Sequence, residues 1–175
     1  TSEWSGVEIM EAHRIAQQHH LIGPTVEQPQ YNLFERNKIE NEFLMVYKTV
    51  GLGTTIWSPL ASGMLTGKYN KGVPDDSRFG IKGFEWLKDR WMQDKVLNAV
   101  QSLGQLASEL GVTLPALSIA WCVKNPNVTT AILGATRKEQ LIENLKSLDV
   151  LDLLTPEVMN SIDTITGTKP ILPEY

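Results

Sequence analysis

The chain has 175 residues, of which 42% are hydrophobic, and a formal net charge of −4. This composition is typical of one globular domain and excludes a disordered chain. The basic residues are scattered rather than clustered, and no apolar stretch reaches the ~20 residues that span a bilayer, so we expect a cytoplasmic protein without nucleic-acid binding or membrane insertion.

The first residues predict a helix followed by a short strand. Ser5 and Glu8 have the spacing of a Ser-x-x-Glu capping box, which predicts a helix over about residues 6–19. Residues 25–28 then read as a short buried strand that ends at Pro29.

A second helix and a second strand come next. We assign the cap of this helix to Asn37, and apolar residues recur at three- and four-residue steps until Gly51, which we expect to be a left-handed stop. A β-rich strand over residues 54–57 leads into a Gly- and Pro-containing segment over residues 58–83, which is too long for a simple connection.

The remaining sequence predicts four helices and a third strand. In chain order we expect an amphipathic helix over about residues 96–110, a buried helix capped by Thr113, a strand over 128–133, a helix over 137–148 and a helix capped by Thr155. Strands that alternate with helices imply a parallel sheet covered by helices. We therefore predict an α/β fold. Three parallel strands leave two edges unpaired, and a barrel needs eight strands, so we expect the chain to be part of a larger structure.

The sequence contains no set of metal ligands. Its single cysteine, Cys122, lies in an apolar helical pattern, which indicates a buried, inert thiol and no internal disulfide. His13, His19 and His20 lie on or at the end of one polar helix without carboxylates arranged beside them. We predict no metal.

Two junctions between a strand and a loop have the character of ligand sites. The first, TTIWSPLASGMLTGKY over residues 54–69, runs from a strand into a small-residue loop that ends at the cation Lys68, as a phosphate-binding loop does. At the second, Gly134 lets the backbone approach a ligand and Thr136 is expected to cap the next helix, whose N-terminus attracts phosphate. Two junctions of one kind suggest one shared ligand.

Each residue at these junctions also has a purely structural explanation. Trp57 could be core packing, Lys68 and Arg78 could be solvated surface charges, and Thr136 with Glu139 could be only a capping box. Their location in small-residue loops favours a ligand, and capping and ligand binding can hold together.

Four segments make the chain similar to the aldo-keto reductase superfamily: TSEWS at 1–5, VEQPQYN at 26–32, WSPLASG at 57–63 and LGAT at 133–136. They follow the family order with comparable spacing, and the chain most resembles the branch that contains β subunits of voltage-gated potassium channels. The resemblance implies a (β/α)8 TIM barrel. Residues 1–175 would be its C-terminal part, a partial NADP-dependent oxidoreductase domain with about three βα units, a long loop and a C-terminal helix, the first half being absent.

The resemblance also implies the activity. Family members reduce carbonyls with NADPH through an Asp, a Tyr, a Lys and a His or Asn, and by this alignment none of these four positions lies within residues 1–175. The full protein would then transfer hydride to a small-molecule aldehyde or ketone, and this chain alone would be inactive. Two alternatives are a redox-sensing subunit with slow or no turnover, which docks as a homotetramer on the cytoplasmic domain of an ion channel, and an inactive fragment.

The resemblance assigns cofactor contacts residue by residue. Ser2 and Gln28 would hydrogen-bond the nicotinamide carboxamide, and Trp57 would stack on its ring. The pyrophosphate loop would contribute Ser58, Pro59, Leu60, Ser62 and Lys68. The adenosine and its 2′-phosphate would contact Arg78, Thr136, Gln140, Glu143 and Asn144, with Gly134 permitting close approach.

Two acidic residues depart from the family pattern. Glu3 stands where relatives often have an amide or Arg, and Asp76 replaces an aromatic residue found near the adenosine in animal channel subunits. Because an acid repels phosphate, we assign neither to the site. Glu27 lies in the first strand, and we expect it to make a structural hydrogen bond rather than to act as a general base.

Overall fold

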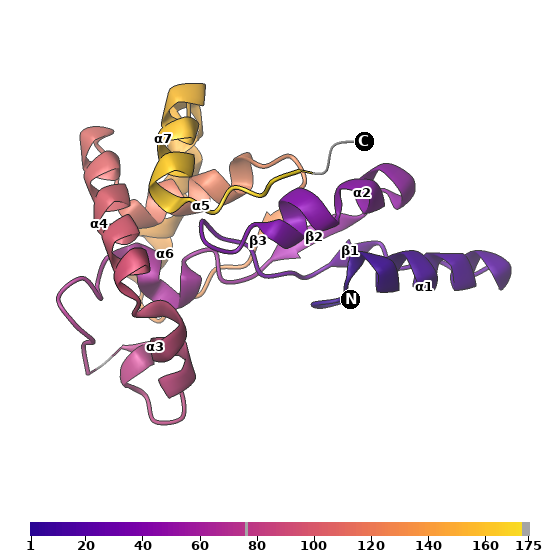
Figure 1. The fold of residues 1–175 in the computed structure, drawn as a ribbon, viewed down its shortest axis with the longest axis horizontal. Helices are drawn as coiled ribbons and strands as arrows, with labels where there is room; N and C mark the ends of the chain where they lie inside the picture. The colour runs from indigo at the N-terminus through magenta and orange to yellow at the C-terminus, as the bar shows by residue number, and fades with distance from the viewer. Residues whose placement is uncertain (76, 173–175) are drawn as a thin grey trace. The chain divides into compact units, whose positions relative to one another are not determined.

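The computed structural model of the protein describes residues 1–75 and 77–172 (Figure 1). The departure noted at Asp76 therefore lies outside the described residues. The chain divides into two compact units, each described here by itself. Unit 1 comprises Thr1–Pro59, Cys122–Leu133 and the described part of Thr168–Tyr175, and unit 2 comprises Leu60–Trp121 and Gly134–Gly167.

Unit 1 is built on a small parallel sheet, which confirms the α/β prediction. Its strands lie in the order β1 (Val26–Glu27), β2 (Gly53–Ile56) and β3 (Thr130–Ala131). Its helices are α1 (Gly6–Gln18), α2 (Leu44–Val50) and a π-helical turn over Lys38–Glu42. The sheet is consistent with part of the barrel that the resemblance implies, and its being the C-terminal part stays a prediction.

Helix α1 begins at the predicted capping box. The Ser5 hydroxyl accepts a hydrogen bond from the Glu8 amide at 3.2 Å, and the Glu8 carboxylate accepts one from the Ser5 amide at 2.7 Å. Helices α1 and α2 pack side by side (Figure 1). Their contact is close at Gly6, because a Cβ there would lie 3.2 Å from a methyl of Val46 and would push it outward by a few tenths of an ångström. The buried core beneath them consists of Ile9, Phe43, Val46 and Leu52.

Unit 2 is helical. Its elements are 3-10 turns over Ala61–Thr66, Arg78–Gly80 and Lys146–Leu153, helices α3 (Glu85–Trp91), α4 (Asp94–Glu109), α6 (Lys138–Leu145) and α7 (Pro156–Thr166), and most of α5 (Leu114–Lys124). Helix α4 packs against α7 (Figure 1). The predicted caps of α5 and α7 are confirmed, since the Thr113 hydroxyl accepts from the Ala116 amide and the Thr155 hydroxyl from the Val158 amide.

Three local predictions are wrong. The strand expected over 128–133 is reduced to the two residues of β3, which pair with Thr55 and Ile56 of β2. The helix expected over 137–148 ends at Leu145 and continues as a 3-10 turn. Asn37 does not cap the second helix: its backbone is already helical, whereas a capping residue is extended, and its side-chain oxygen accepts from Asn41.

Within residues 1–75 and 77–172, no single helix is both long and apolar enough to cross a bilayer. Helices α4 and α5 reach the required length and composition only as a pair with a 92° bend between them.

Candidate cofactor site

Trp57 directly follows β2 and continues its parallel pairing. A parallel bridge joins it to Gln30, its amide donates to the Pro29 carbonyl at 3.0 Å, and its carbonyl accepts from the Tyr31 amide at 3.2 Å. The half-buried indole is held at its edge, where Nε1 donates to Glu3 Oε1 at 2.8 Å. Both the backbone and the ring of Trp57 are therefore fixed at the carboxyl end of the strand.

Ser2 and Gln28 lie beside each other at the same edge of the sheet. A parallel bridge pairs them, and the Ser2 hydroxyl donates to the Gln28 carbonyl at 3.2 Å. The Gln28 side-chain amide has no hydrogen-bond partner among the residues that the structure describes. Within unit 1, the structure thus brings Ser2 and Gln28 together as a pair. Like Trp57, both lie at the carboxyl ends of strands, where parallel α/β sheets bind ligands.

Glu3 is the residue that sequence reasoning missed in unit 1. Its carboxylate accepts hydrogen bonds from Trp57 Nε1 at 2.8 Å, the Gln30 amide at 2.6 Å and Lys38 Nζ at 2.8 Å. Burial opposes ionisation, but the hydrogen bonds from Lys38, Trp57 and Gln30 together lower the pKa of Glu3 below its usual value. The only signal in the sequence was that Glu3 departs from the family pattern.

Left-handed backbone is concentrated after Trp57. Among the described residues, five other than glycine have positive φ, and three of them are Ser58 (φ 56°), Ala61 (48°) and Ser62 (57°). Such conformations cost of order 1 kcal/mol or more each and persist where the surrounding structure enforces them, often at ligand sites. Pro59 between them is buried and Leu60 is half-buried.

Lys68 folds back over the turn Ala61–Thr66 in unit 2. A Cβ on Gly63 would lie 3.2 Å from Lys68 Nζ, so the ammonium group rests against this glycine. Lys68 Nζ also lies 5.0 Å from the centre of the Tyr69 ring. The loop cation is therefore held at the small-residue turn, and its role in binding phosphate stays a prediction.

Two buried rings connect the segments of Lys68 and Arg78. Tyr69 and Phe79 are 1% and 4% exposed, and their rings stack with 4.1 Å between centres and 9° between planes. Arg78 itself is exposed. The buried Tyr69 hydroxyl has no hydrogen-bond partner within the described chain, which is uncommon for a folded protein. No sequence pattern indicated a role for Tyr69 or Phe79.

The start of α6 differs from the expectation. Arg137, with extended backbone, occupies the capping position, so Thr136 lies one residue outside the helix and its hydroxyl does not cap it. Gln140 instead closes this end: its side-chain oxygen accepts from the Thr136 amide at 2.8 Å and the Arg137 amide at 3.3 Å. Gly134 and Thr136 are exposed.

Glu143 and Asn144 follow on α6. Glu143 accepts from the Thr113 hydroxyl at 2.7 Å and pairs with Lys146 at 2.7 Å, and the hydrogen bonds from Lys146 and Thr113 lower the pKa of Glu143. Asn144 is 5% exposed. Within the described part of unit 2, no hydrogen bond, ion pair or ring contact joins the group formed by Gly134, Thr136, Gln140, Glu143 and Asn144 to Lys68 or Arg78.

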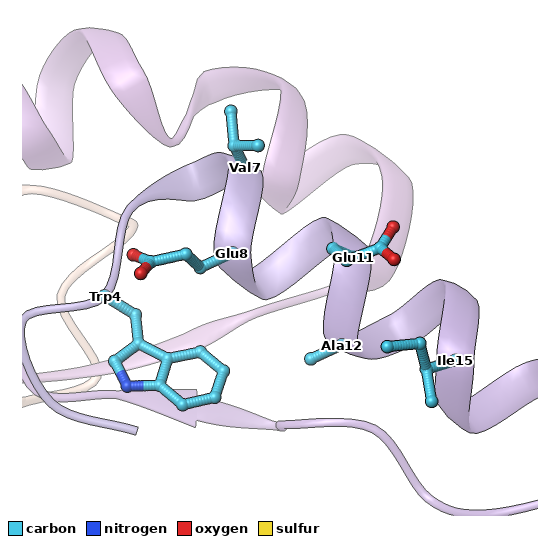
Figure 2. Close-up of a pocket in the computed structure, with 6 residues that line it drawn as sticks. All are labelled: Trp4, Val7, Glu8, Glu11, Ala12 and Ile15. Carbon is cyan, nitrogen blue, oxygen red and sulfur yellow. The ribbon is translucent and has the colours of Figure 1, made fainter.

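A hollow on α1 is separate from these residues (Figure 2). Figure 2 shows the Trp4 indole lying below the helix near Ala12, and the complete lining is Trp4, Val7, Glu8, Glu11, Ala12 and Ile15. No predicted cofactor residue lines this hollow. Glu27 makes the structural hydrogen bond expected of it, since its buried carboxylate accepts from the Trp4 amide at 2.9 Å.

A parallel sheet with polar and aromatic residues at its carboxyl edge is typical of α/β proteins that bind a ligand at that edge. Comparison with known proteins identifies the family. Residues 1–166 match the model of the aldo/keto reductase family, so the chain belongs to this family, as predicted. Members of this family are oxidoreductases that generally use NAD(P)H.

Two plant proteins are similar to the chain. It is 54% identical over 171 residues to a "Probable voltage-gated potassium channel subunit beta" of Oryza sativa subsp. japonica. The aligned region covers 97% of this chain and 52% of that protein. It is 53% identical over 175 residues to a protein of the same name from Arabidopsis thaliana, covering 99% of this chain and 53% of that protein. The chain therefore spans about half the length of these curated relatives, and the predicted likeness to the channel β-subunit branch is confirmed.

Proposed function

We propose that the protein carrying this chain is an NADPH-dependent aldo-keto reductase that transfers hydride to a small-molecule aldehyde or ketone. The observation that carries the proposal is Trp57, fixed by backbone and ring at the carboxyl end of β2 and followed at once by the left-handed residues Ser58, Ala61 and Ser62. A rigid aromatic residue that leads into a strained small-residue loop suits a planar ring attached to phosphates. Membership of the aldo/keto reductase family supports the same ligand.

Residues of unit 1 would bind the nicotinamide end. Ser2 and Gln28, which lie side by side, supply a hydroxyl and an amide to the carboxamide. Trp57 would stack on the ring and so fix which of its faces is turned toward the substrate. A ring held in one orientation lowers the entropy cost of reaching a reactive geometry.

The loop that follows Trp57, together with residues of unit 2, would bind the phosphates and the adenosine. The residues of this chain fit such a group, because Lys68 Nζ lies against Gly63 at the turn and the loop before it supplies the hydroxyls of Ser58 and Ser62. Lys68 would act on the pyrophosphate with Ser58, Pro59, Leu60 and Ser62. The adenosine and 2′-phosphate would take Arg78, Gly134, Thr136, Gln140, Glu143 and Asn144.

Glu143 and Gln140 constrain how this second group would bind. Both already accept hydrogen bonds from the protein, so their oxygens are engaged at the start and along the side of α6. The amide nitrogen of Gln140 is the group left to donate to a ligand oxygen. NADPH would supply the hydride, and the acid that protonates the carbonyl would lie outside residues 1–175.

A second function is favoured by the names of the relatives, both of which are called probable channel β subunits. In this alternative the protein binds NADPH with slow or no turnover. It senses the redox state of the cofactor and docks in the cytoplasm as a homotetramer on the cytoplasmic domain of an ion channel. The cofactor residues named above serve both functions equally.

One experiment separates the two functions. Full-length protein carrying this chain is loaded with NADPH and mixed with a panel of aldehydes and ketones, and oxidation of the cofactor is followed by its absorbance in single-turnover and steady-state conditions. Repeated turnover with at least one carbonyl supports the reductase. Tight NADPH binding without steady-state turnover supports the sensing subunit, and failure to bind NADPH contradicts both.

A further inference from the structure

We propose that Glu3 is a positioning residue for Trp57, one that holds the indole ring in the orientation needed to stack on a nicotinamide. This inference rests on the proposed function, since it assigns Glu3 to the same site. The residue does not need to touch the cofactor to act in this way.

The carboxylate of Glu3 joins the ring of Trp57 to the neighbouring strand. Its Oε1 atom accepts both from Trp57 Nε1 at 2.8 Å and from the Gln30 amide at 2.6 Å. Gln30 is the residue that forms the parallel bridge to Trp57. One oxygen therefore fixes the indole edge relative to the backbone that already carries Trp57, and rotation of the ring would break a charge-assisted hydrogen bond.

The second oxygen of Glu3 is held from another direction. Lys38 Nζ donates to Oε2 at 2.8 Å, and this ammonium group comes from the π-helical turn Lys38–Glu42 rather than from the sheet. The carboxylate thus has a cation on one oxygen and two N–H donors on the other. This arrangement keeps it charged and limits its own rotation.

The backbone places Glu3 for this task. Ser2 pairs with Gln28 at the sheet edge, and the Glu3 amide donates to the Gln28 carbonyl at 3.4 Å. Glu3 itself has a left-handed φ of 60°, which is rare for a residue with a long side chain. The chain turns here so that the Glu3 side chain reaches Trp57, and such strained positions persist when surrounding contacts hold them.

Without Glu3, the half-buried ring of Trp57 would lose its edge contact and could adopt other rotamers. The cofactor would then have to select the stacking orientation on binding, which weakens its apparent affinity in proportion to the fraction of protein in that orientation. This cost weakens binding of the cofactor and does not act on binding of the carbonyl substrate. We therefore expect weaker NADPH binding and a lower kcat, with the carbonyl KM unchanged.

A double-mutant cycle in the full-length protein tests this assignment. Calorimetric titration with NADPH is carried out on Glu3→Ala, Trp57→Phe and the double variant, because Phe keeps a ring but lacks the N–H donor. We expect Glu3→Ala to raise the Kd for NADPH about fivefold in the presence of Trp57 and to have no further effect in the Trp57→Phe background. An equal loss in both backgrounds would overturn the assignment, since the effect would then pass through Gln30 or Lys38.

Three further variants keep the result interpretable if Glu3→Ala folds poorly. Glu3→Gln retains an acceptor oxygen and is expected to keep most of the affinity, whereas Glu3→Asp is one methylene too short and is expected to lose it. Glu11→Gln removes an exposed carboxylate paired with Arg14 and should change nothing. If Trp57→Ala weakens NADPH binding but the Glu3 variants do not, the positioning role of Glu3 is overturned while the proposed function stands. If Trp57→Ala has no effect on NADPH binding, both the positioning role and the proposed function are overturned.

Discussion

The rings of Tyr69 and Phe79 stack almost in parallel, with 4.1 Å between their centres and 9° between their planes. Each ring is the neighbour in sequence of a cation assigned to the cofactor phosphates, Lys68 before Tyr69 and Arg78 before Phe79. The stack therefore fixes the spacing of the two backbone segments that carry these cations. A change in packing at this point should alter ligand binding as well as stability.

Phe79→Leu should show both effects. Loss of the stacked ring is expected to lower the free energy of unfolding by about 1–2 kcal/mol. The Kd for NADPH should rise severalfold, because the segments of Lys68 and Arg78 are no longer held together. Urea unfolding and NADPH titration measure the two effects. Phe84→Leu is the matched control, since Phe84 is 38% exposed in the same part of unit 2 and should change neither quantity by much.

Gly63→Ala should displace Lys68. A Cβ at this position would lie 3.1 Å from Lys68 Cε and 3.2 Å from Nζ, and the φ of 95° adds strain of about 1 kcal/mol. Gly83 has nearly the same φ, 94°, but nothing within 4 Å of a Cβ. We expect both alanine variants to lose similar stability and only Gly63→Ala to weaken NADPH binding. Equal binding by the two variants would contradict the role of Lys68.

Arg78→Ala should separate NADPH from NADH. If the exposed Arg78 guanidinium binds the 2′-phosphate, its loss should raise the Kd for NADPH about tenfold and leave the Kd for NADH unchanged. The effect should shrink as salt is added, because exposed charges are screened. Lys71→Ala removes another exposed cation of the same segment and serves as control. A similar loss for both cofactors would place Arg78 elsewhere on the ligand.

The stability that Glu3 contributes should depend on pH. The pKa of Glu3 is lowered in the folded protein, against the opposing effect of burial, by hydrogen bonds from Lys38, Trp57 and Gln30. Its contribution is therefore fully present above the unfolded-state pKa of about 4.3 and is lost as the pH falls through the lower folded value. Urea unfolding of the wild type and Glu3→Gln at several pH values between 7 and 3 checks this. The difference in stability between them should shrink as the pH falls toward 3, and a constant difference would contradict it.

Much of the fold was predictable from local sequence rules. The capping box at Ser5, the left-handed stop at Gly51 and the caps at Thr113 and Thr155 all form as expected, because each depends on the chemistry of a few adjacent residues. The extent of β3 was not predictable in this way. The number of residues that pair depends on how the two strands meet in the fold, and only Thr55 and Ile56 of β2 pair with β3.

The candidate site was only half predictable. The positions of Ser2, Gln28 and Trp57 at strand ends follow from the parallel sheet, which the sequence predicted. The contacts of Glu3 did not follow, because they join residues 27 to 54 positions apart through a left-handed turn at Glu3 itself. The contact of Asn125 with the buried Tyr31 hydroxyl, across 94 positions, was not predictable from local sequence either. This hydroxyl donates to Glu40, and burial and the Glu40 charge raise the pKa of Tyr31.

The most direct test of the central claim is the affinity of the full-length protein for NADPH, measured by calorimetry with and without Trp57→Ala. The account predicts saturable binding that weakens at least about fivefold on loss of the indole, since base stacking on an aromatic side chain is worth ~1–3 kcal/mol. Saturable binding that Trp57→Ala leaves unchanged would contradict the site proposed at the carboxyl end of β2. Absence of any saturable binding would contradict the reductase itself.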